Sequence, residues 1–105
     1  MAEFVAHAPQ DGVASLAVSG EVDIAVVEAL LAEGRACLES APSGLEVDLG
    51  GVSFIDSSGL GTLVRLRNEA TDLGKSIALT NVPPATLRLL EVTGLVDAFA
   101  ARTGD

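Results

Sequence analysis

The segment that most constrains the fold leads from an apolar stretch, residues 45–55, into a helical pattern, residues 60–73. The sequence Asp-Ser-Ser-Gly-Leu-Gly at residues 56–61 joins the two. A strand-to-helix junction brings free backbone N–H groups and the positive end of a helix dipole to one place, and Asp and Ser are good caps there. Gly59 and Gly61 each cost about 1 kcal/mol relative to Ala inside a helix. We therefore expect an open surface at this junction that another molecule can approach closely.

The rest of the chain predicts strands and helices in alternation after an initial hairpin. The hairpin turns at residues 9–12, where Pro and Gly stand in positions that turns favour. Strands are predicted at 3–8, 13–19, 45–49 and 76–80, helices after Asp23, over 60–73 and from Pro84, and a last short strand at 95–100. Gly20 is expected to end the second strand. The strand at 45–49 alternates apolar and acidic residues, which predicts one wet face and helices mainly on the other.

Length and charge limit the class of protein. The 105 residues suffice for one domain, 1–105, with an aliphatic core, since the chain has no Trp or Tyr. A net charge of −9 argues against binding nucleic acid, which requires clustered Lys and Arg. A single cysteine, Cys37, excludes an internal disulfide and is expected to be a small buried apolar group. With no signal peptide and no apolar run of membrane-spanning length, we expect a cytoplasmic protein without membrane insertion.

The residues do not favour an enzyme. A serine at a strand–helix turn is typical of nucleophile elbows, but Gly-x-Ser-x-Gly is absent around Ser57 and Ser58. The only histidine, His7, lies at the wrong end of the chain and is expected to be a surface residue on an edge strand. There is no Gly-rich phosphate loop, and no His or Cys accompanies Asp23, Asp48 or Asp56 as a metal site needs. We therefore expect no catalytic residues, no metal and no cofactor in this chain.

Three motifs resemble a known family. The run Asp-Ser-Ser-Gly-Leu-Gly at 56–61 resembles the signature of STAS domains of the anti-sigma factor antagonist type. Gly-Glu-Val-Asp at 20–23 is similar to the family's Gly-Glu-Leu-Asp box, and the Pro-initiated helix ending in Thr-Gly-Leu at 93–95 also fits its pattern. The resemblance implies the STAS fold: a four- to five-stranded mixed, mostly parallel sheet with helices mainly on one face. It also leaves little room after Ala100 for the terminal helix common in the family.

The resemblance implies a function for the junction. In the family, the first serine after the aspartate is phosphorylated by an anti-sigma factor that is also a serine kinase of the GHKL type. Here that serine is Ser57, and the implied partner-binding residues are Asp23, Asp56, Ser57, Ser58, Gly59, Leu60 and Gly61. ATP and magnesium belong to the partner kinase, and a phosphatase is a further candidate partner. An alternative is a STAS interaction subunit of a lipid-transport or stressosome-type complex.

The expected switch acts at the surface. A phosphoserine carries about −1.5 to −2 charges, which suits the N-terminus of a helix. We expect a phosphate on Ser57 to meet unpaired N–H groups there and to leave the fold unchanged. It should end the complex by bulk and by repulsion against the partner's nucleotide phosphates.

Overall fold

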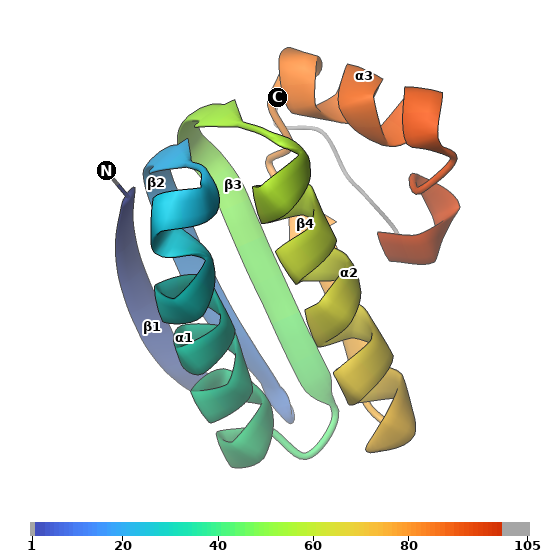
Figure 1. Cartoon of the computed structure of the whole chain (residues 1–105). Coiled ribbons are helices and arrows are strands. Elements are labelled where there is room, and N and C mark those ends of the chain that lie inside the picture. The colour runs from blue at the N-terminus through green and yellow to red at the C-terminus, as the bar shows by residue number, and fades with distance from the viewer. Residues whose placement is uncertain (1, 100–105) are drawn as a thin grey trace.

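The computed structural model describes residues 2–99 and shows a four-stranded sheet with three α-helices (Figure 1). The strands lie in the order β1-β2-β3-β4, with β1 antiparallel to β2 and the other pairs parallel. Their bounds are β1 Ala2–Gln10, β2 Val13–Val22, β3 Gly44–Ile55 and β4 Ser76–Thr80. The mixed, mostly parallel sheet predicted from the sequence is confirmed.

Two long helices cover one face of this sheet. Figure 1 shows α1 and α2 side by side in front of the strands, while α3 stands apart from them. The helices are α1 Val27–Ser40, α2 Ser57–Asp72 and α3 Pro84–Thr93, with 3-10 turns η1 Ile24–Val26 and η2 Asp97–Phe99. Arg35 of α1 forms a bidentate ion pair with Glu69 of α2. The Nε and Nη2 atoms of Arg35 each donate to one carboxylate oxygen of Glu69 at 2.8 Å. This hydrogen-bonded pair lowers the pKa of Glu69 and raises that of Arg35.

The core lies between the helices and the sheet and is aliphatic, as predicted, with the exception of the completely buried Phe99. Alternate residues of β2 and β3 point into it and are almost completely buried: Ala14, Leu16, Val18, Leu45, Val47 and Leu49. Cys37 is buried on α1, as expected, and burial is the main cause that raises the pKa of its thiol. The intervening residues of β3, Glu46 and Asp48, are only partly buried, because they face the side of the sheet that α1 and α2 leave uncovered.

The predicted last strand at 95–100 is wrong for the residues that the structure describes. Asp97–Phe99 form a 3-10 turn, and Ala100 lies outside the described residues. Two contacts explain the difference. The carbonyl of Ala98 accepts a hydrogen bond from Arg67 Nε at 2.8 Å, and the Phe99 side chain is completely buried. The segment thus packs by its side chains and does not add to the edge of the sheet.

Several element boundaries also differ from the prediction. Strand β3 continues past Leu49 to Ile55. Strand β2 continues past Gly20 to Val22, and Gly20 instead takes a φ of +86° beside a shift in the β2–β3 register. A left-handed residue there is natural for glycine and disturbs the ladder without ending it. Helix α1 begins at Val27, after the turn η1, and α2 already begins at Ser57, before the apolar stripe at Leu60.

Candidate functional site

The candidate site lies where β2 and β3 end together. In their parallel ladder Val22 pairs with Ile55, and the Asp56 N–H donates to the Val22 carbonyl at 3.2 Å. Asp23 and Asp56, far apart in sequence, each follow one of these paired residues. The structure therefore brings the two predicted aspartates to the same end of the sheet, where η1 and α2 begin.

Asp56 is the N-cap of α2. Its Oδ1 accepts hydrogen bonds from the backbone N–H groups of Ser58 at 3.0 Å and Gly59 at 3.2 Å, and from the Ser58 hydroxyl at 2.5 Å. The bond from the Ser58 hydroxyl is the largest cause that lowers the pKa of Asp56, and the bond from the Gly59 N–H adds to it. The side chain is thus an ionised, fixed carboxylate at the start of the helix.

The two serines differ in availability. Ser58 is partly buried, and its hydroxyl is donated to Asp56. Ser57 is the first residue of α2 and is exposed, and its hydroxyl makes no hydrogen bond to any residue between 2 and 99. Of the pair, Ser57 therefore presents the free hydroxyl.

Asp23 caps a turn, as its sequence position predicts. Its Oδ1 accepts from the Ala25 N–H at 3.0 Å, and the element that it caps is the 3-10 turn η1 rather than α1 itself. The side chain is partly buried. A cap of this kind fixes one carboxylate oxygen against the backbone and holds the charge beside the start of α2.

The glycines of the junction have different reasons to be glycine. Gly59 is buried, and a Cβ there would lie 2.7 Å from Val22 Cγ1 and 2.9 Å from the Val22 carbonyl oxygen. Gly61 is exposed, with nothing within 4 Å of a Cβ. The prediction of an open surface is wrong for Gly59, which lets α2 pack against the strand ends, and fits Gly61. The Leu60 side chain is also buried, as part of the core.

Sequence reasoning missed two large apolar side chains at this end of the molecule. Ile24, the residue after Asp23, is 75% exposed, and Phe54, two residues before Asp56, is 52% exposed. Both residues are next to the motifs at 20–23 and 56–61. Ile24 directly follows the cap residue Asp23, and this position at the start of a turn could have indicated that its side chain is exposed. Both therefore present apolar surface to solvent near the ends of β2 and β3.

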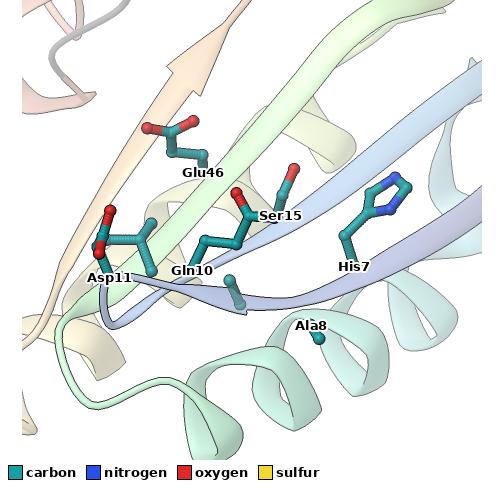
Figure 2. Close-up of a pocket in the computed structure, with 8 residues that line it drawn as sticks. His7, Ala8, Gln10, Asp11, Ser15 and Glu46 are labelled. Atoms are coloured by element: carbon teal, nitrogen blue, oxygen red, sulfur yellow. The ribbon is translucent and has the colours of Figure 1, made fainter.

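A pocket lies at the opposite end of the sheet from the candidate site. The pocket in Figure 2 is lined by His7, Gln10, Asp11, Ser15 and Glu46, around the β1–β2 turn and away from Ser57. His7 is exposed on the edge strand, as predicted. No group of three His, Cys, Asp or Glu side chains within residues 2–99 could hold a metal ion. None of the helices in that range is long and apolar enough to cross a membrane.

Comparison with known proteins agrees with this architecture. The family model described as "Mlab, STAS domain" matches residues 5–99. An anti-sigma-B factor antagonist of Bacillus subtilis is 32% identical over 80 residues, 76% of this chain and 72% of that protein. The crystal structure of an anti-sigma factor antagonist from Mycobacterium paratuberculosis superposes with a TM-score of 0.85 at 28% identity, covering 99% of this chain and 87% of that one.

A more distant structure shares the fold. The phosphorylated form of the Bacillus cell fate determinant SpoIIAA has a TM-score of 0.76 at 19% identity, covering 98% of this chain and 92% of that one. Together with the matching family model, the mixed four-stranded sheet with α1 and α2 on one face identifies an α/β domain of the STAS type. The chain belongs to the STAS domain family.

Proposed function

We propose that this protein is an anti-sigma factor antagonist that binds an anti-sigma factor with serine kinase activity and is switched off by phosphorylation of Ser57. The observation that carries the proposal is the exposed, unbonded hydroxyl of Ser57 at the N-terminus of α2, beside a neighbouring serine whose hydroxyl is occupied. The relatives named anti-sigma-B factor antagonist support the first part of the proposal.

The docking surface in this proposal consists of Asp23, Ser57, Ser58 and Gly61 with Asp56 behind them. The two carboxylates are held by backbone caps, so a partner meets fixed charges and loses little side-chain entropy in binding them. Gly59 and Leu60 were also expected to bind the partner, but both are buried and lie beneath this surface. They shape the first turn of α2 rather than contacting the partner.

The chemical step belongs to the partner. A GHKL-type kinase holds ATP and Mg²⁺, and the Ser57 oxygen attacks the γ-phosphorus. The new bond joins Ser57 Oγ to phosphorus, and the bond from phosphorus to the bridging oxygen of ADP breaks. ADP leaves with the electron pair, and the serine proton passes to a base of the kinase. This domain supplies the hydroxyl and no catalytic group or cofactor.

One expectation about the backbone N–H groups at the start of α2 is wrong. The N–H groups of Ser58 and Gly59, expected to be unpaired, already donate to Asp56. A phosphate on Ser57 therefore meets the helix dipole together with a neighbouring carboxylate, and the two effects oppose each other. The modified surface gains negative charge beside the carboxylates of Asp23 and Asp56, which favours separation from the partner's nucleotide phosphates.

Incubation with candidate anti-sigma kinases and ATP, followed by intact-mass analysis, tests the proposal. We expect the mass to rise by one phosphate, with the site at Ser57 by peptide mapping. Complex formation without phosphate transfer to any serine would favour the alternative, an interaction subunit of a lipid-transport or stressosome-type complex. A phosphatase that restores the original mass would identify a second partner.

A further inference from the structure

The outer edge of β1 is an unprotected strand edge. β1 ends the sheet and is nine residues long, whereas strands average about five to six. Natural edge strands are usually protected by Lys, Pro, bulges or inward charges. Here Pro9 and the register irregularity between His7 and Gln10 protect only the end of the strand. From Ala2 to His7 the one acidic residue is Glu3, and the strand contains no Lys or Arg.

The side chains of β1 divide cleanly between the two faces. Phe4 and Ala6 pair with Val18 and Leu16 of β2, which are buried under the helices. Paired residues in an antiparallel ladder point to the same face. Glu3, Val5 and His7, which pair with Ser19, Ala17 and Ser15, therefore point to the uncovered face. Figure 2 shows His7 and Ser15 on the same side of the sheet, with Ala8 pointing the other way.

We propose that β1 pairs antiparallel with β1 of a second copy of this chain, about a two-fold axis at Val5. The pairing would join the two sheets edge to edge into one. A two-fold axis perpendicular to the sheet keeps the helices of both copies on the same face of the joined sheet. Because opposite residues of an antiparallel pair point to the same face, this axis must pass through a residue position and not between residues.

Charge complementarity selects this register among the neighbouring ones. With the axis at Val5, this 55% exposed side chain meets its own copy, and Glu3 faces His7 of the second copy on both sides of it. An imidazole donates an N–H to a carboxylate in either protonation state. An axis at Phe4 would place Glu3 opposite Val5, and an axis at Ala6 would place Glu3 opposite Pro9. Of these three registers, only the one with its axis at Val5 places an apolar side chain opposite an apolar one and also places the carboxylate of Glu3 opposite the donor of His7.

The high net charge of the chain does not oppose this contact directly. Apart from Glu3, the acidic residues lie outside β1. At 0.15 M ionic strength charges more than about 8 Å apart are largely screened. The second copy would contact the backbone of β1, and the only acidic side chain on that strand is Glu3.

Sedimentation of the full chain between 10 µM and 1 mM, a span of about two decades on the affinity scale, tests the proposal. We expect a reversible monomer–dimer equilibrium whose dissociation constant rises about tenfold or more in Val5→Lys. Val92→Lys is the matched control, because Val92 is 79% exposed on α3, and it should change the constant less than about twofold. A wild-type chain that stays monomeric at 1 mM, or a dimer that survives Val5→Lys, would overturn the proposal.

A charge exchange checks the register without relying on Val5. His7→Glu places Glu3 opposite a second carboxylate and should weaken the dimer about tenfold, and adding Glu3→Lys should restore it. Both positions are exposed, so the fold should survive in each variant, as far-UV circular dichroism can verify. Failure of the double variant to regain the affinity lost in His7→Glu would exclude this register.

Discussion

The hydroxyl of Ser58 donates to Asp56 Oδ1 at 2.5 Å, whereas the hydroxyl of the adjacent Ser57 makes no hydrogen bond within the described residues. This relationship separates two residues that are chemically identical in sequence. The Ser58 hydroxyl takes part in the cap, whereas the Ser57 hydroxyl does not. It also lets the two positions be tested against each other with the same substitution.

We expect Ser57→Ala to abolish phosphorylation by the partner kinase while it changes binding affinity less than about threefold, because the cap at Asp56 remains. Ser58→Ala removes a hydrogen bond from Asp56 and should cost about 0.5–1.5 kcal/mol of stability, yet leave phosphorylation possible. Peptide mapping after reaction with ATP distinguishes the two variants. A phosphate found on Ser58 would exclude our assignment.

A fixed negative charge at Ser57 should imitate the phosphorylated state. We expect Ser57→Asp to raise the dissociation constant for the partner about tenfold, since a carboxylate desolvated without a matching cation is costly. The fold should persist, because acidic residues are favourable in the first turn of a helix. Ser40→Asp is a control that adds the same charge at an exposed position. Ser40 is the last residue of α1, at the end of the sheet away from Ser57, so this variant should bind as the wild type does. Undiminished binding by folded Ser57→Asp would count against the switch.

The two glycines of the first turn should respond oppositely to alanine. Gly59→Ala forces a Cβ to within 2.9 Å of the Val22 carbonyl oxygen and should destabilise the protein by about 1–3 kcal/mol. The Cβ added by Gly61→Ala would contact nothing within 4 Å, and the position is helical, so this substitution should stabilise the protein by up to about 1 kcal/mol. Urea unfolding of both variants measures the difference. Equal effects would show that packing under Gly59 is not as described.

Asp56 should contribute to the dependence of stability on pH. Its pKa in the folded protein lies below the ordinary value of 3.8, so its charge stabilises the fold above about pH 4, and this stabilisation is lost as the pH falls through the folded pKa. Asn is about as good an N-cap but carries no charge. The free-energy difference between the wild type and Asp56→Asn should therefore be largest at neutral pH and shrink below pH 4. A difference that stays constant down to pH 2 would refute the role of the charge.

Phosphorylation should alter the surface and leave the core in place. We expect the amide chemical shifts to change mainly near residues 20–23 and 56–63, the two segments that meet at the end of β2 and β3. The free energy of unfolding should change by less than about 1 kcal/mol, because the helix dipole and the Asp56 carboxylate act in opposite directions. Large shifts across β4 would instead indicate that the phosphate remodels the fold.

Much of this fold could be predicted from hydrophobic periodicity and from the residues that start and end helices and strands. The apolar alternation in β3 and the position of Pro84 gave the right elements, because each local preference agrees with its tertiary surroundings. The failures have physical causes. The segment after Gly94 contains a pattern that fits a strand, but a hydrogen bond from Arg67 and the burial of Phe99 decide its conformation. Contacts of this kind join residues remote in sequence and leave no local signal.

The candidate site was predicted in composition but not in geometry. The motifs at 20–23 and 56–61 indicated the residues of the candidate site, and the structure brings the two segments to the same end of the sheet. The hydrogen bond from the Ser58 hydroxyl to Asp56 depends on which of two adjacent serines turns toward the cap, and the motif does not distinguish them. The close approach of Gly59 to Val22 joins two elements remote in sequence, and helical periodicity carries no sign of it.

Because β2, β3 and β4 run parallel, the connections of the molecule fall into two sets at opposite ends of the sheet. The turn at Asp11–Gly12, the loop at residues 41–43 and the turn at Gly74 all lie at the end away from Ser57. The Ser43 N–H donates to the Gly12 carbonyl and the Ser76 N–H donates to the Ser43 carbonyl, so these connections also brace one another. A fluorescent reporter attached to the exposed side chain of Asp11 would therefore sit on a fixed end of the sheet, away from Ser57. Binding of the proposed partner could then be followed in real time with no label at the contact itself.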